Sequence, residues 1–231
     1  MPTQEPIKIS RIDKLIIFLI CVVISIISSY KLLLVPFLQS SIIISWCVSF
    51  FEVLISCGFL ILVSRKENPT INSRQILLII SLLLIVQAIK TIFGSGLSPL
   101  SIIVPPALII SQGMGTITAL TWVSIACLSW PDSINEININ LLLITLICAC
   151  IVSVLGGKIR SRAQLLQLSI FVPFGAFLTQ WLLIGNNQTF LVDNQGFPVS
   201  NGEIFSNSFL LAIIMLITIL FIPIFESIFG L

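Results

Sequence analysis

Almost every apolar stretch of this chain is long enough to cross a lipid bilayer, and that feature limits its solvent and its fold class. A crossing α-helix needs about 20 mainly apolar residues, within a range of roughly 17–25. Charged residues make up 9 % of the 231 residues, whereas they make up about 25 % of an ordinary soluble domain. The mean hydropathy is +1.17. The sequence therefore predicts an all-α, polytopic transmembrane helical bundle.

Eight apolar segments are predicted to be the membrane helices. They span residues 15–36, 41–63, 75–93, 98–113, 115–130, 138–157, 164–185 and 206–229. Six of them are long enough to cross the bilayer. The fourth and fifth are short and are interrupted by proline and glycine, so they form either two thin crossings or one re-entrant hairpin. Irregular backbone at that depth must be shielded by other helices or line a cavity.

Lysine and arginine gather in three places that alternate along the predicted crossings. They precede the first segment, lie between the second and third, and lie between the sixth and seventh: Lys8, Arg11, Lys14, Arg65, Lys66, Arg74, Lys158, Arg160 and Arg162. The opposite loops contain no basic residue and four acidic ones: Asp132, Glu136, Asp193 and Glu203. Because cytoplasmic loops carry an excess of lysine and arginine, both termini are expected in the cytoplasm, or in the stroma of a plastid.

The chain is expected to have three parts. Residues 1–14 form a cytoplasmic tail, residues 15–36 an anchor helix, and residues 40–231 a seven-segment transmembrane module. The first apolar run is long and is followed by no small-residue cleavage site, so it is predicted to remain as an anchor. The frequent use of Ile, Asn and Phe suggests AT-rich coding. The expected location is therefore a plastid (chloroplast) membrane or a bacterial inner membrane.

The chain has no histidine, which removes the commonest general base and the commonest metal ligand. Its six cysteines all fall in apolar segments without CxxC spacing, so they are predicted to be packing residues. No phosphate-binding, dinucleotide-binding or nucleophile-elbow motif is present. A net charge of +2 without a long basic run indicates no nucleic-acid partner. We therefore expect no enzyme activity, no catalytic residue, no metal site and no cofactor.

Two ionisable residues lie inside predicted crossings. Glu52 is near the middle of the second segment, where a charge costs about 2.5–3.5 kcal/mol, so a functional role is the default hypothesis. The alternative is a protonated Glu52 that hydrogen-bonds to a neighbouring helix. Lys90 is near the far end of the third segment and can extend to the interface. A Glu52–Lys90 ion pair is a further hypothesis, although their depths differ by about two helical turns.

Other polar and aromatic residues in or near the apolar runs are predicted to be structural. Four glutamines are expected to hydrogen-bond between helices, which contributes about 0.6–2 kcal/mol each: Gln87, Gln112, Gln167 and Gln180. Four tryptophans are expected to pack in the bundle or to lie at the membrane interface: Trp46, Trp122, Trp130 and Trp181.

Three features, taken in order, carry a resemblance to a known family. The first is the proline-rich run Ser98–Pro106, which contains Pro105 and Pro106 and is followed by Gly113-Met114-Gly115. The second is the basic loop Gly156–Arg162. The third is the run Ile222–Gly230, in a pattern that contains Pro223, Glu226, Phe229 and Gly230. Together they resemble the membrane region of the seven-transmembrane receptors with an intracellular HD hydrolase domain.

The resemblance implies an architecture. Members of that family hydrolyse cyclic di-AMP, and they have an N-terminal anchor, an external sensor, seven crossings and then the hydrolase. Here the first segment would be the anchor, and the next seven, within residues 40–231, the crossings. The sensor would be reduced to a few residues around Pro36–Ser40. The HD domain, which is named for a His-Asp metal site, is expected to be missing.

The expected function is therefore a non-catalytic sensory or anchoring module. Its expected partners are the lipid bilayer and a separate cytoplasmic output protein, and its oligomeric state is left open. A sensor needs two packings that a ligand binds unequally, and the predicted ligand site is Glu52 with the Pro105-Pro106 break. One alternative is a small transporter or channel, because broken helices beside a buried ionisable residue also occur there. Another is an assembly factor for a membrane complex.

Overall fold

The computed structural model describes residues 11–32, 42–69, 71–93, 98–130, 139–159, 161–186 and 201–229. All regular secondary structure in these ranges is α-helical. The helices are α1 (Arg11–Leu32), α2 (Ile42–Glu67), α3 (Ser73–Phe93), α4 (Pro99–Met114), α5 (Thr116–Leu128), α6 (Ile139–Gly156), α7 (Arg162–Asn186) and α8 (Asn201–Phe229). The predicted polytopic helical bundle is confirmed. Several boundaries differ by four or more residues: α1 is Arg11–Leu32 rather than 15–36, α2 ends at Glu67 rather than 63, and α8 begins at Asn201 rather than 206.

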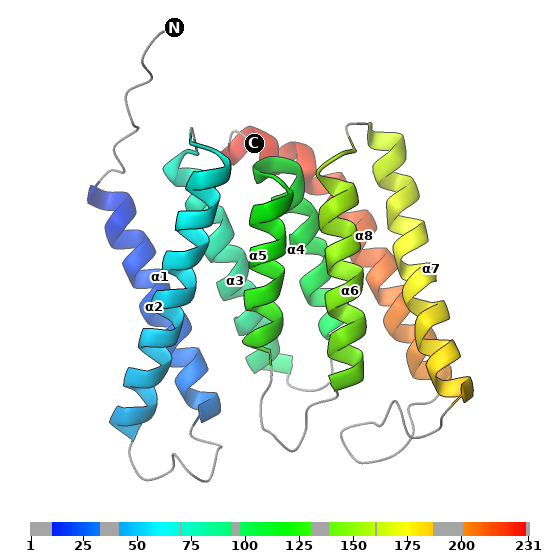
Figure 1. Cartoon of the computed structure of the whole chain (residues 1–231), viewed down its shortest axis with the longest axis horizontal. Coiled ribbons are helices and arrows are strands. Elements are labelled where there is room, and N and C mark those ends of the chain that lie inside the picture. Colours follow the sequence, from blue (N-terminus) through cyan, green and yellow to red (C-terminus); the bar gives the residue numbers. More distant parts are fainter. Residues whose placement is uncertain are drawn as a thin grey trace, which may run out of the picture.

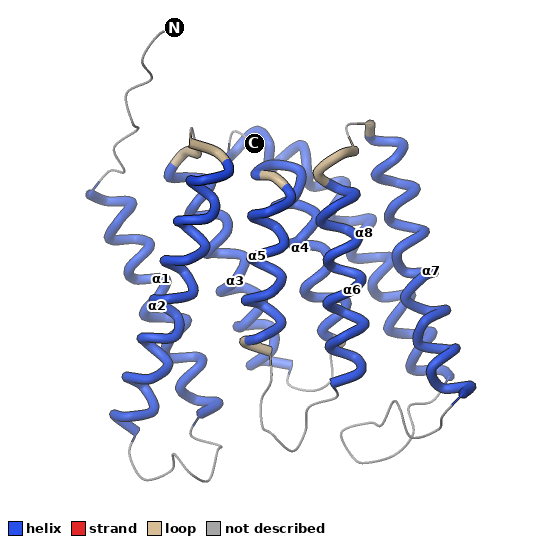
Figure 2. Tube along the Cα trace, viewed as in Figure 1, coloured by secondary structure: helices blue, strands red, loops and turns tan. Residues whose placement is uncertain are grey.

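The helices lie side by side, and each runs antiparallel to the one before it (Figure 1). α1 therefore begins, and α8 ends, on the same side of the bundle. Helices make up nearly all of the described chain, and the described connections between them are short (Figure 2). This alternation agrees with the alternating placement of basic residues along the sequence.

Four helices contain a span long and apolar enough to cross a membrane, and these belong to α2, α3, α7 and α8. Shorter apolar stretches occur in α1 and α6, and α4 and α5 are themselves short, with 16 and 13 residues. At 1.5 Å per residue, α4 is about 24 Å long and α5 about 20 Å long, less than the roughly 30 Å of a hydrocarbon core. The two form an antiparallel hairpin joined at Gly115, whose φ of 102° favours glycine.

α4 is the central helix of the bundle. Thirteen of its 16 residues are buried, and it packs against α3, α5, α6 and α8. Ser98, just before the helix, has an extended backbone, and Pro99 occupies the first turn. Proline is tolerated there because the N–H group that it lacks would have no partner within the helix. The surrounding helices bury Pro105 and half-bury Pro106, which explains how a double proline is tolerated inside this helix.

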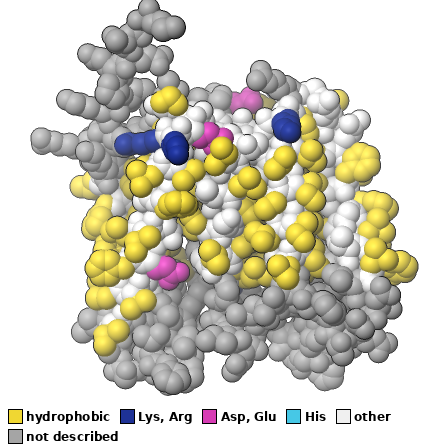
Figure 3. Space-filling model, in the orientation of Figure 1, with side chains coloured by type: hydrophobic (Ala, Val, Ile, Leu, Met, Phe, Trp, Pro, Cys, Tyr) yellow, Lys and Arg dark blue, Asp and Glu magenta, His cyan; other side chains and the backbone are white. Residues whose placement is uncertain are grey.

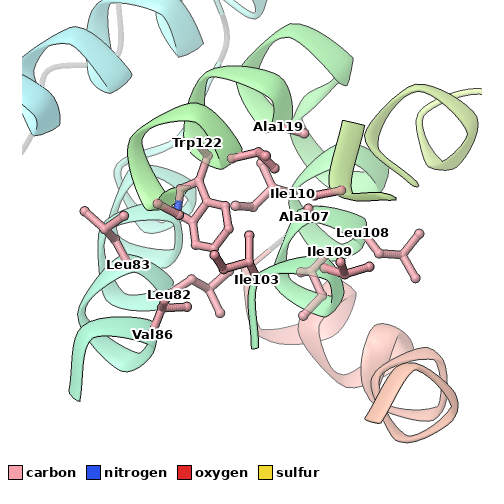
Figure 4. Close-up of a cluster of buried hydrophobic side chains, with 14 of the residues drawn as sticks. Leu82, Leu83, Val86, Ile103, Ala107, Leu108, Ile109, Ile110, Ala119 and Trp122 are labelled. Carbon is pink, nitrogen blue, oxygen red and sulfur yellow. The ribbon is translucent and has the colours of Figure 1, made fainter. Parts of the chain in front are cut away.

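Among the described residues, the largest fully buried side chain is that of Trp122 in α5. Its indole Nε1 donates a hydrogen bond to the Ile79 carbonyl oxygen of α3 at 3.1 Å. The ring lies between side chains of α3, such as Leu82, and side chains of α4, such as Ile103 (Figure 4). The predicted packing role of Trp122 is confirmed. The six cysteines are free thiols, four of them buried, which agrees with their predicted packing role.

Candidate functional site

One end of the bundle carries most of the exposed basic side chains of the described residues. At this end α2 gives way to α3 and α6 to α7 (Figure 1), and the exposed basic residues are Arg65, Lys66, Arg74, Lys158 and Arg162. Figure 3 shows Lys and Arg side chains near this end, above a surface with many hydrophobic side chains. We call it the basic end. The α4–α5 turn and the last turns of α8 lie there too.

Gln112, in the last turn of α4, ties α4 to the end of α6. Its Nε2 donates hydrogen bonds to the carbonyl oxygen of Gly156 and, at 3.1 Å, to that of Ile159. Gly156 ends α6, and the last carbonyls of a helix have no partner within it. The Gln112 amide therefore caps α6 from a neighbouring helix. The predicted interhelical role of Gln112 is confirmed.

Gly156 and Gly157 allow the end of α6 to approach the α4–α5 turn closely. A Cβ atom on Gly156 would lie against Ser111 Oγ and, at 3.0 Å, against Leu108 Cδ1. A Cβ atom on Gly157 would press on Thr116 Cγ2. The Gly-Gly pair of the basic-loop motif is thus required by packing against the proline-containing helix α4.

A cavity of about 80 Å³ lies between the end of α4 and the last turns of α8. Its lining residues are Ile109, Gln112, Gly113, Ile222, Phe225 and Glu226. The cavity is lined by the Gln112 amide and by the exposed Glu226, and it has room for a few water molecules. Gln112 belongs both to this lining and to the α6 cap. The proline-rich segment, the basic loop and the C-terminal motif therefore converge at one side chain.

The α4–α5 turn is also held by the end of α2. The Glu67 carboxylate accepts hydrogen bonds from Thr118 N at 2.7 Å, Thr118 Oγ1 at 2.8 Å and Ile117 N at 3.2 Å. Asn68 Nδ2 donates to the Met114 carbonyl oxygen at 2.5 Å. Residue Gly115, at the N-cap of α5, has no side chain for this task, so a carboxylate from another helix satisfies the free N–H groups. Glu67 and Asn68 are not among the residues predicted from the sequence.

We expect Glu67→Ala to destabilise the protein by about 1–2 kcal/mol, because it leaves two N–H groups at the start of α5 without an acceptor. Glu67→Gln, which keeps one acceptor oxygen, should cost less. The measurement is the unfolding midpoint in mixed micelles titrated with SDS. The neighbouring exposed Lys66→Ala serves as the control, and an equal loss in Lys66→Ala and Glu67→Ala would contradict the capping role.

The predicted intramembrane residues lie apart from this site and from one another. Glu52 is exposed on the outer surface of α2. Lys90 is buried, 3 % exposed, and its Nζ lies 4.4 Å from the ring centroid of Trp130. That cation–π contact contributes about 2 kcal/mol where the amine is desolvated. The structure does not bring Glu52 to Lys90 or to the buried Pro105.

The remaining predicted residues differ in their burial and in their contacts. Gln87 donates from Nε2 to Ser129 Oγ at 2.5 Å, which confirms its predicted interhelical role. Gln180 is buried and its Nε2 has no hydrogen-bond partner among the described residues, and Gln167 is exposed on α7, so the predicted interhelical hydrogen bonds of these two glutamines are not found. Pro106 and Pro223 are half-buried. The side chain of Phe229, and Gly230 as a whole, lie outside the described residues.

One comparison with known proteins gave a match. The sequence model of the family described as "7TM receptor with intracellular HD hydrolase" matches residues 43–231, which begin just inside α2 and include α3–α8. Comparison with curated proteins and with solved structures gave no match. The matched region leaves α1 outside.

Proposed function

This chain belongs to the family of 7TM receptors with an intracellular HD hydrolase, and from that premise we propose that it is a non-catalytic receptor module that holds and signals to a separate hydrolase. The basic end would face the cytoplasm or stroma, because lysine and arginine are enriched there. The 231 residues contain no histidine, so a His-Asp metal site would have to come from another polypeptide segment. We propose a plastid or bacterial inner membrane from the frequent use of Ile, Asn and Phe, which suggests AT-rich coding.

The observation that carries this proposal is the convergence of three segments at Gln112. In the family the hydrolase follows the last membrane helix, and here the last turns of α8 meet α4 across the cavity. A shift of α4 would alter its hydrogen bonds to Gly156 and Ile159 and its packing on α8 together. Packed helices tend to switch between discrete arrangements rather than to deform continuously. α4 is therefore the element through which a membrane signal would reach the basic end.

The test is to isolate the full chain from its native membrane in mild detergent and to follow both association and hydrolysis of cyclic di-AMP. We expect an HD-domain protein to co-purify, and the complex but not the chain alone to hydrolyse the dinucleotide. Gln112→Leu should change the affinity of that protein for the chain by about fivefold or more, the lower range of allosteric coupling. Gln167→Leu, on the exposed face of α7, is the matched control and should change nothing.

Two results would overturn the proposal. Hydrolysis by the purified chain alone would make it an enzyme. An ion flux through proteoliposomes containing the chain, without any associated HD-domain protein, would support the transporter alternative instead.

A further inference from the structure

Glu52 occupies an unusual position for a carboxyl group. It is exposed on α2, ten residues from the start of that helix at Ile42 and 13 residues before Arg65. At 1.5 Å per residue these separations are about 15 Å and 20 Å, too far for a glutamate side chain to reach either helix end. Among the charged side chains in the described ranges, Glu52 alone is exposed away from a helix end. Lipid offers it no hydrogen-bond partner.

Glu52 also lies in a regular stripe along α2. The stripe runs at alternating spacings of four and three residues, and its members are Val48 (46 % exposed), Glu52, Ile55 (66 %), Phe59 (53 %) and Leu62 (69 %). This 3.5-residue repeat is the seam by which two helices pack in a left-handed pair. The helices α1, α3 and α5 pack against α2, and the five stripe residues stay exposed beside them. The stripe is therefore free to meet a helix from another molecule.

We propose that this stripe, with Glu52 at its centre, is the surface by which two copies of the chain associate in the membrane. Two copies inserted with the same topology are related by a two-fold axis along the membrane normal, so each stripe residue meets its own counterpart. A protonated carboxyl group both donates and accepts a hydrogen bond. Two Glu52 side chains can therefore satisfy each other, which makes a second copy sufficient as the partner. A polar residue at one seam position also fixes the register of such a pair.

This surface differs from the basic-end site in location and residues, and it does not depend on the proposed signalling function. The pairing would place two basic ends next to each other on the same side of the membrane. Any output protein bound there would meet a symmetric pair of sites.

The experiment measures self-association of the full chain in lipid bilayers by single-molecule photobleaching at graded protein-to-lipid ratios. We expect a monomer–dimer equilibrium whose dissociation constant rises about five- to thirtyfold in Glu52→Leu, the factor that corresponds to about 1–2 kcal/mol of interhelical hydrogen bonding. Glu52→Gln, whose amide also donates and accepts, should remain close to the wild type. An unchanged unfolding midpoint in both variants shows that the bundle itself is intact.

A second measurement locates the contact. A benzophenone amino acid placed at Ile55 should crosslink two copies, whereas the same group at Ile170 of α7, which is equally exposed at 66 %, should not. A chain that stays monomeric at every density would overturn the proposal, as would a dimer unaffected by Glu52→Leu. Crosslinking through position 170 but not 55 would also overturn it, and so would crosslinking from position 55 to a different protein in the native membrane without self-crosslinking.

Discussion

Trp122→Ala should destabilise the bundle by about 3 kcal/mol. The side chain is fully buried between α3 and α4, and its removal leaves a large cavity and deletes the hydrogen bond to the Ile79 carbonyl oxygen. Tryptophan-to-alanine changes in protein cores cost about 3–5 kcal/mol. We expect the lower end, because lipid lacks the hydrophobic driving force that water adds. The measurement is the SDS-induced unfolding midpoint in mixed micelles.

Two further variants separate the packing of Trp122 from its hydrogen bond. Trp122→Phe keeps most of the apolar volume and loses the Nε1 donor. We therefore expect it to lower the free energy of unfolding by about 1–2 kcal/mol. Trp181→Ala removes a ring that is 51 % exposed on α7 and should cost under about 0.5 kcal/mol. A Trp122→Ala variant no less stable than Trp181→Ala would show that α5 does not pack against α3 and α4 as described.

Replacing glycine by alanine should lower the stability of the protein in α6 but leave it unchanged or raise it in α2. Gly156→Ala places a methyl group against Ser111 Oγ and Leu108 Cδ1 at the contact of α4 with α6, so we expect a loss of about 1–3 kcal/mol. Gly58→Ala meets no atom within 4 Å, and alanine is the better helix former by about 0.5–1 kcal/mol. Gly58→Ala should therefore be neutral or stabilising in the same unfolding measurement.

The comparison of Gly156 with Gly58 tests the close approach of α6 to α4 directly. Both glycines lie in helices of an apolar chain, so effects of composition or expression apply equally to them. Stabilisation by Gly156→Ala would mean that the end of α6 stands away from α4, and the Gln112 cap would then be in doubt as well.

The positions of the helices were predictable because long apolar runs in lipid admit few structures other than helices. The missed boundaries have a physical reason. Arg11 and Asn201 lie in polar sequence beyond the apolar runs, where helical backbone continues without any hydropathy signal. Hydropathy marks the part of a helix that lipid covers rather than its full length.

The outward orientation of Glu52 could not be predicted from the sequence, because α2 is apolar on all its faces and no pattern distinguishes the lipid side from the protein side. The ligand site that the sequence predicts at Glu52 and the Pro105-Pro106 break stays a prediction, and Glu52 itself is exposed on α2. Glu67 follows Arg65 and Lys66 and reads as an ordinary solvated charge in a basic loop. Its capping role depends on the N-terminus of helix α5, where its partner Ile117 lies 50 residues further along the chain. Only the tertiary structure brings the two together.

The convergence at Gln112 was predictable in part. Its position in an apolar run indicated an interhelical hydrogen bond, but its acceptors lie 44 and 47 residues further along the chain. The three motifs that carried the family resemblance were separate stretches in the sequence. Their meeting at one end of the bundle is the main result that the structure adds.

The most direct test of that meeting is residue-specific crosslinking between α4 and α8 in membranes. Cysteines placed at Gly113 and Phe225, which line the same cavity, should be joined by a short bis-maleimide, with the linked peptides identified by mass spectrometry. The pair Gly113 and Leu220 is the control, because Leu220 is 66 % exposed on α8. The account predicts linkage of 113 to 225 and little of 113 to 220. Efficient labelling at 113 and 225 without any link between them would contradict it.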